Sequence, residues 1–207
     1  MRDDLIAAAL RGKDNAIADL LVGVLADEAG YNNETLIKAL RGNTSVLAKA
    51  AEITAVLVRS MSGDTPALAI AVRFWQALLD SNRKTVPAEV LRHNGRWALV
   101  EGLPDDVWAP MMARTLTITG GMIHFAIEVA DRCETVPIQE FSTEILLLLQ
   151  GCGELWEQHH GAEIGLKALR TLSASRPDGN FLALRIRLIE LGHDEAADIE
   201  PWDGDLT

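Results

Sequence analysis

Apolar residues recur every three or four positions along most of this chain, whereas the alternation typical of a half-buried strand is hard to find. The clearest series places apolar side chains at i, i+4, i+7 and i+11: Val46, Ala50, Ile53 and Leu57. This spacing puts them on one face of a helix with a 3.6-residue period. The pattern predicts a helix that Asn43 or Thr44 caps and that runs to about Met61.

Proline and glycine divide the rest of the chain into further helices of the same kind. Pro66, Pro87 and Pro104 each stand where a helix begins, since a proline in the first turn loses no hydrogen bond. Gly120 and Gly121 then interrupt the pattern. The predicted helical stretches are 65–81, 87–101, 104–117, 122–130, 137–149, 164–172 and 180–191. With short helices in the first 42 residues, we expect an all-α fold of about ten helices, forming one domain over residues 1–193.

An internal repeat indicates how these helices are arranged. Ala9-Leu10-Arg11-Gly12 recurs as Ala39-Leu40-Arg41-Gly42, and each copy reads as a short helix, a glycine turn and a longer apolar helix. A period of about 30 residues built from helix pairs resembles the HEAT and armadillo group of α-solenoid proteins. The resemblance implies a stacked array of antiparallel helices that offers a surface to protein partners. An irregular, compact helical bundle is the alternative.

Charge is concentrated at the C-terminal end. The chain has 30 acidic and 19 basic residues, and residues 188–207 contain seven acids and no base. We therefore interpret residues 194–207 as an acidic tail. Nucleic acid and anionic membrane surfaces are poor partners for such a chain, because both are bound through clustered Lys and Arg. A basic partner protein is favoured instead.

Cellular location and cofactors follow from what the sequence lacks. The start, Met1-Arg2-Asp3-Asp4, is acidic where a secretory signal needs positive charge. No stretch is apolar over enough residues to span a bilayer, so we expect a cytoplasmic protein. Phosphate-binding loops and nucleophile elbows are absent as readable motifs. We expect no cofactor and no catalytic residue.

A metal site is the alternative to a binding function. Glu157 and His160, and again Glu190 and His193, form Glu-x-x-His motifs. Two such motifs on facing helices resemble the di-iron carboxylate bundles, and the resemblance implies iron or manganese held by these four side chains. Each motif stands beside a glycine that ends a helix, which favours polar helix C-termini instead.

One further histidine has two interpretations. His124 and Glu128 stand four residues apart, on one face of the predicted helix over 122–130, as a catalytic pair would. The apolar neighbours of His124 favour a buried structural histidine.

Two groups of residues are candidates for contact with a protein partner. In the tail, acidic residues flank a tryptophan, and a basic groove on a partner would receive such a segment. Further upstream, two arginines flank a helical tryptophan, a combination common at interfaces. The candidates are Asp198, Glu200, Trp202, Asp203 and Asp205 in the tail, and Arg92, Arg96 and Trp97 upstream. The helical tryptophans Trp75, Trp97, Trp108 and Trp156 are most simply predicted to lie in the core, so Trp97 has both interpretations.

These observations favour a non-enzymatic protein-interaction module, such as an adaptor, an assembly factor or an inhibitor of the immunity-protein type. A helical surface and the acidic tail would make the contact. A self-associating structural subunit is a further alternative, because the first helix, over residues 5–10, is apolar enough to seek a neighbour, and a homodimer would cover it.

Overall fold

The computed structural model describes residues 17, 21, 37, 43–60, 65–135, 147–148, 159–173 and 179–201. Within these ranges the regular structure is entirely helical, which confirms the all-α prediction. Seven α-helices and two 3-10 helices lie there, compared with about ten helices expected for the whole chain. Both copies of the Ala-Leu-Arg-Gly string, most of the predicted helix over 137–149, and Trp156 lie outside the described residues.

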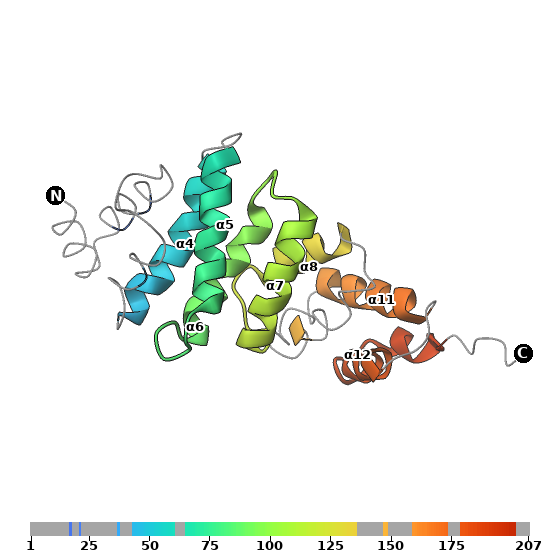
Figure 1. The fold of residues 1–207 in the computed structure, drawn as a ribbon. Helices are drawn as coiled ribbons and strands as arrows, with labels where there is room; N and C mark the ends of the chain where they lie inside the picture. The colour runs from blue at the N-terminus through green and yellow to red at the C-terminus, as the bar shows by residue number, and fades with distance from the viewer. Residues whose placement is uncertain are drawn as a thin grey trace, which may run out of the picture.

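The described elements follow one another closely along the chain. They are α4 (Thr44–Ser60), α5 (Thr65–Asp80), α6 (Ala88–Leu91), η1 (Arg92–Leu99), α7 (Asp105–Thr119), α8 (Ala126–Thr135), α11 (His159–Ser173), α12 (Gly179–Glu190) and η3 (Asp194–Asp198). Figure 1 shows them arranged in chain order along an elongated body, with α4 towards one end and α12 and η3 at the other. None of the helices in the described part of the chain is long and apolar enough to cross a membrane.

The helix boundaries agree with the start and stop signals in the sequence. The Asn43 side chain caps α4, since its Oδ1 accepts the N–H of Val46 at 3.1 Å. The α7 helix begins directly after Pro104 and ends at Gly120, whose φ of 63° is a left-handed conformation that glycine adopts without strain. Pro87 likewise precedes α6, but the α-helix continues for only four residues before it tightens into η1.

The predicted helix over 122–130 begins late. Residues 122–125 form a turn, and α8 starts only at Ala126. Gly121, with a φ of 79°, packs so closely on residue 147 that an added Cβ would lie 1.6 Å from the Leu147 carbonyl oxygen. The chain therefore turns sharply here instead of starting a helix. As a result His124 is exposed and lies outside the helix, so both its assignment to the core and its place on one helix face with Glu128 were wrong.

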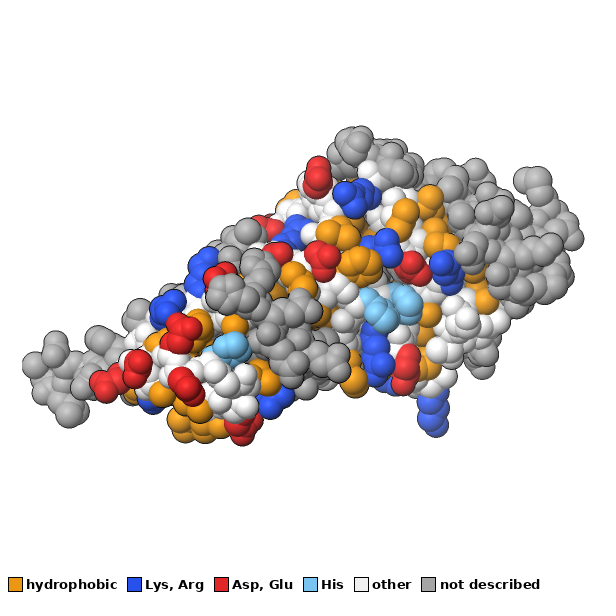
Figure 2. All heavy atoms as spheres, turned by 180° about the vertical axis from the view of Figure 1, so that it is seen from behind, with side chains coloured by type: hydrophobic (Ala, Val, Ile, Leu, Met, Phe, Trp, Pro, Cys, Tyr) orange, Lys and Arg blue, Asp and Glu red, His pale blue; other side chains and the backbone are white. Residues whose placement is uncertain are grey.

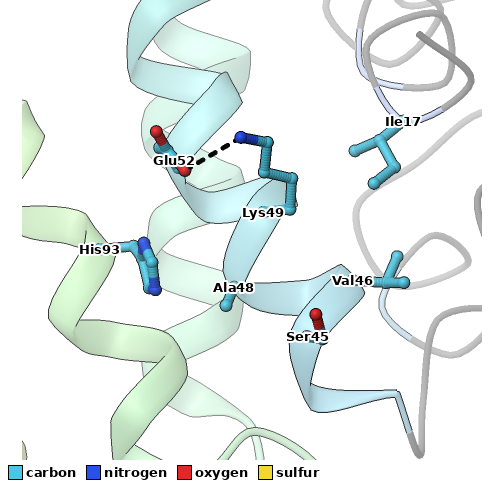
Figure 3. Close-up of a pocket in the computed structure, with 7 residues that line it drawn as sticks. All are labelled: Ile17, Ser45, Val46, Ala48, Lys49, Glu52 and His93. Atoms are coloured by element: carbon cyan, nitrogen blue, oxygen red, sulfur yellow. Dashed lines mark hydrogen bonds and ion pairs between the residues drawn. The ribbon is translucent and has the colours of Figure 1, made fainter. Parts of the chain in front are cut away.

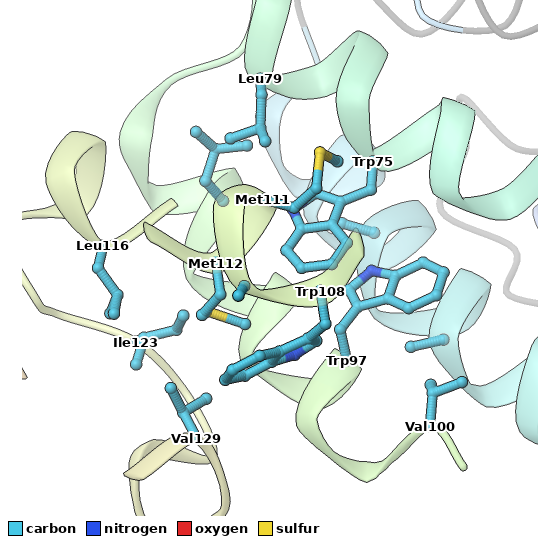
Figure 4. Packing of buried hydrophobic residues seen from close by; sticks show 14 of the residues in the cluster. Trp75, Leu79, Trp97, Val100, Trp108, Met111, Met112, Leu116, Ile123 and Val129 are labelled. Carbon is cyan, nitrogen blue, oxygen red and sulfur yellow. The ribbon is translucent and has the colours of Figure 1, made fainter. Parts of the chain in front are cut away.

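Three tryptophans form the centre of the core, as predicted for each of them (Figure 4). Trp75 of α5 stacks on Trp97 of η1 with ring centroids 5.1 Å apart and an interplanar angle of 11°. The Trp75 indole N–H donates to the Thr115 hydroxyl at 3.1 Å, which satisfies the polar edge of the buried ring. Trp108 of α7 is fully buried nearby. The stack joins α5, η1 and α7 into one packed unit.

One largely buried arginine, Arg132, connects η1, the following loop and α7 to α8. The Arg132 guanidinium lies over the Trp108 ring, 4.8 Å from its centroid. It donates to the Asp105 carboxylate at 3.1 and 3.2 Å and to three main-chain carbonyls, those of Trp97, Val100 and Leu103. Because Val100 and Leu103 lie in the connection between η1 and α7, Arg132 fixes the path of that connection.

Candidate functional site

The first candidate site lies where η1 meets α4 and the turn before α8. The η1 backbone approaches the turn closely, because the His124 N–H donates to the Arg92 carbonyl at 3.0 Å. Gly95 makes this approach achievable, since a Cβ there would lie 1.7 Å from the His124 carbonyl oxygen. The His93 and His124 rings consequently lie 4.6 Å apart, centroid to centroid. Figure 2 shows two neighbouring histidines on this face, with basic and acidic side chains around them.

A cavity of about 320 Å³ opens beside His93. Its walls are Ile17, Ser45, Val46, Ala48, Lys49, Glu52 and His93, so the first turns of α4 supply most of it. In Figure 3, Ile17 and Val46 lie on one side, while Glu52 and His93 lie on the other. The cavity therefore has both an apolar and a polar wall.

A carboxylate of the polar wall pairs with two cations, one in the wall and one behind it. The Glu52 carboxylate pairs with Lys49 at 3.4 Å and with Arg96 at 3.1 Å. One carboxylate thus joins a cation of its own helix to a cation of η1. Arg96 also stacks on the Phe125 ring, with its guanidinium carbon 4.5 Å from the ring centroid, so its position is fixed from two sides.

His93 is a neutral member of this wall near pH 7. Burial lowers the pKa of His93 below its ordinary value of 6.5, and the neighbouring His124, Lys49 and Arg96 lower it further, against an opposing contribution from Glu52. The imidazole therefore contributes hydrogen bonds rather than charge.

Two of the predicted partner residues belong to this site. Arg92 and Arg96 are half-buried on η1, and Arg92 contacts the sulfur of Met122 at 3.5 Å. Trp97 is only 1% exposed and forms part of the tryptophan stack, so it supports the site from behind.

The second candidate site is the outer face of α12, which we call the α12 surface: Leu182, Ile186 and Ile189. These three side chains are 56%, 48% and 38% exposed, and they account for three of the five exposed large apolar residues among those described. They stand at i, i+4 and i+7, so they form one stripe. The opposite face carries Phe181, Leu184 and Leu188, which are buried.

An acidic C-terminal segment adjoins the α12 surface. It consists of Glu190, Asp194, Glu195, Asp198 and Glu200, all of them exposed. Part of it packs on the body, since Ala196 of η3 is fully buried and Arg185 of α12 donates to the Ala196 carbonyl at 3.1 Å. Asp198 and Glu200 thus extend from an anchored element, while Trp202, Asp203 and Asp205 lie outside the described residues.

The proposed metal ligands are described only in part. Glu190 is exposed and pairs with Arg187 at 3.2 Å, and His193 is half-buried after the end of α12. Glu157 and the side chain of His160 lie outside the description. Within the described ranges, no three His, Cys, Asp or Glu side chains converge as a metal ion would require.

The sequence contains only part of the signal for these two sites. The sequence of α12 contains two apolar series, one at 181, 184 and 188 and one at 182, 186 and 189. Only the structure shows that the first series is buried and the second exposed. The pairing of His93 with His124 has no local signal, because 31 residues separate them. Comparison of the chain with protein-family models, curated proteins and solved structures found no match.

Proposed function

We propose that this protein is a non-enzymatic interaction module that binds a basic, amphipathic segment of a partner protein on the α12 surface and the acidic C-terminal segment. The observation that carries this proposal is an exposed apolar stripe beside five exposed carboxylates at one end of the molecule.

The apolar stripe supplies the hydrophobic contribution to binding. Single exposed apolar residues are ordinary on a protein surface, but a contiguous group of three large ones is a typical mark of a docking surface. Leu182, Ile186 and Ile189 have the spacing by which one helix presents its face to another helix or to a groove.

The acidic segment defines the chemistry of the partner. Nearby basic side chains already have partners: Arg185 binds main-chain carbonyls, Arg187 pairs with Glu190, and Arg170 approaches Glu195 at 3.9 Å. Asp194, Asp198 and Glu200 remain as exposed carboxylates beside them. Lys or Arg on the partner would complement this field, raise the association rate and make binding sensitive to salt.

The arrangement of the helices supports the same role. The described helices succeed one another in chain order, and α11 and α12 contact each other near the C-terminal end. We propose a helical array of the HEAT or armadillo kind, in which the last helix of the stack presents its outer face to a partner.

A designed peptide tests the proposed chemistry directly. A synthetic amphipathic helix of Leu and Lys is titrated into the protein by calorimetry, with a peptide of the same pattern in Leu and Glu as its control. We expect the basic peptide to bind, and the double variant Leu182→Gln/Ile186→Gln to weaken that binding about thirtyfold, as expected from losing two anchors of about 1 kcal/mol each. The matched control is Val56→Gln, which removes a comparably exposed apolar residue from α4. Equal loss in both variants, or equal affinity for both peptides, contradicts the proposal.

The role of the acidic segment needs a truncation that spares η3. Deletion from Asp194 onward would remove the buried Ala196, so the informative variant ends after Ile199 and loses only Glu200, Asp203 and Asp205 among the acids. We expect weaker binding of the basic peptide at low salt and little difference at high salt. If sedimentation instead shows a dimer that Ile186→Gln dissociates, the α12 surface serves a second copy of this chain and the proposal is overturned.

A further inference from the structure

Met122 is the most exposed methionine that the structure describes, and it stands in the turn between α7 and α8. It is 42% exposed, whereas Met111 and Met112 of α7 are 7% and 0% exposed. Exposure largely determines which methionines a peroxide oxidises, because the thioether sulfur must meet the oxidant directly. Of these three side chains, Met122 is therefore the one open to oxidation.

The sulfur of Met122 is a poor partner for the arginine that contacts it. Nη2 of Arg92 lies 3.5 Å from the Met122 sulfur, and a thioether is only a weak hydrogen-bond acceptor. Among the residues that the structure describes, the Arg92 guanidinium has no other acceptor and no ion pair, and its Nε is buried without a partner. A guanidinium has five N–H donors, so the exposed donors of Arg92 are left to water.

The backbone of the turn holds Met122 beside Arg92 independently of the sulfur contact. The His124 N–H donates to the Arg92 carbonyl at 3.0 Å. Phe125 has a φ of 58°, which a bulky residue adopts only where its surroundings impose it, and Arg96 stacks on its ring. Because the turn is fixed against η1, an oxygen added to the sulfur would lie next to the Arg92 guanidinium without any ordering of a loop.

We propose that Met122 is a reversible oxidation site whose sulfoxide is bound by Arg92. The sulfur lone pair attacks one oxygen of hydrogen peroxide and the O–O bond breaks. A proton passes from the transferred oxygen to the departing hydroxide, which leaves as water, so the sulfur is oxidised and the peroxide reduced. Methionine sulfoxide reductases reverse the change. The site is independent of the proposed partner binding, because no residue of the α12 surface takes part in it.

The expected effect on stability is opposite to the usual effect of methionine oxidation. A sulfoxide usually disrupts the packing around it, because a polar oxygen enters an apolar core. At Met122 the oxygen instead meets solvent and a guanidinium that lacks a strong acceptor. A hydrogen bond from a charged donor to oxygen is short and strong, so oxidation should tighten the contact between η1 and the turn before α8.

Peptide mass spectrometry after brief treatment of the folded protein with hydrogen peroxide tests where the oxygen goes. Trypsin releases residues 115–132 as a peptide whose only methionine is Met122, and residues 97–114 as a peptide that contains Met111 and Met112. We expect the first peptide to gain one oxygen well before the second. A mixture of the two methionine sulfoxide reductases should then remove it from the folded protein. Equal rates for the two peptides, or a sulfoxide that the reductases leave in place, overturns the proposal.

Urea unfolding before and after the same treatment tests the role of Arg92. The variant Met122→Leu, treated in parallel, corrects for oxidation of the other methionines. Relative to it, we expect oxidation to raise the urea midpoint of the parent chain. Arg92→Gln should abolish this gain, and the matched control Arg73→Gln, at an exposed arginine of α5, should retain it. An equal gain in Arg92→Gln, or a lower midpoint of the oxidised parent chain, overturns the proposal.

The guanidinium itself gives a second readout that needs no substitution of Arg92. Its side-chain N–H signals, observed by NMR, should move when the parent chain is oxidised and stay in place in Met122→Leu treated in the same way. Signals that do not move in the parent chain overturn the proposal, because Arg92 would then not bind the sulfoxide.

Discussion

Replacement of Arg132 by glutamine tests the account of how η1, the connection after it and α7 are held together. Glutamine keeps part of the aliphatic stem and a hydrogen-bonding amide, but it loses the charge and the forked geometry. The Arg132 side chain is only 13% exposed, so water does not readily replace its five hydrogen bonds. Three main-chain carbonyls and the stacking on Trp108 lose their partner together.

The expected loss can be bounded from these contacts. One hydrogen bond to a charged group contributes about 1.5–3 kcal/mol, and removal of one member of a buried ion pair costs about 3–5 kcal/mol. The Asp105 side chain is 43% exposed, so water can solvate its carboxylate once the arginine is removed. This lowers the part of the loss in unfolding free energy that comes from the ion pair. We therefore expect Arg132→Gln to lower the free energy of unfolding by about 3–4 kcal/mol. That is a large fraction of the 5–15 kcal/mol of a typical domain.

The matched control is Arg114→Gln. Arg114 pairs with Asp80 at 2.7 Å, but both side chains are about half exposed, so the loss should stay below about 1 kcal/mol. Urea unfolding followed by far-ultraviolet circular dichroism at neutral pH measures both variants against the parent chain. If the two variants differ by less than about 1 kcal/mol, the conclusion that Arg132 holds this region together is refuted.

Three further substitutions or conditions probe the region around η1. Asn94 is fully buried, and its side-chain amide has no hydrogen-bond partner among the described residues. Asn94→Leu should therefore raise the free energy of unfolding, measured by urea titration, by about 1–3 kcal/mol. A decrease would contradict this prediction. Gly95→Ala should lower the free energy of unfolding by about 3 kcal/mol, because the new methyl group would meet the His124 carbonyl. The control Gly102→Ala meets no atom and should lower it by only about 1–2 kcal/mol, because the backbone there is left-handed. Equal losses in the two variants would refute the close contact between Gly95 and His124. Burial lowers the pKa of His93 below 6.5, so just below that pH the unfolded chain binds more protons than the folded chain, and the free energy of unfolding should fall as the pH drops. In urea titrations across this pH range, His93→Gln should reduce the pH dependence of the unfolding free energy. An unchanged pH dependence would assign it to other groups.

Local signals determine the helix boundaries well. A cap at Asn43 and turns at Pro104 and Gly120 act within one or two turns of helix, so they are readable from neighbouring residues. The buried face of α12 follows from periodicity for the same reason.

The features that the sequence predicted wrongly, or did not predict, depend on contacts between segments far apart in the chain. The apolar composition of residues 122–125 predicts helix, but close packing of Gly121 on residue 147 imposes a turn. Glu52 of the cavity wall likewise joins α4 to η1 by binding Arg96, which stands 44 residues away. A single sequence contains the ingredients of such a site, and only the fold brings them together.

The tryptophan stack also gives this protein a built-in optical signature. Two indoles at 5.1 Å and nearly parallel are close enough for their electronic transitions to couple. Because Trp75 belongs to α5 and Trp97 to η1, that coupling exists only while the two elements remain packed against each other. It does not depend on the helix content of the chain. Near-ultraviolet dichroism can therefore report the integrity of this contact separately from backbone folding, without any label.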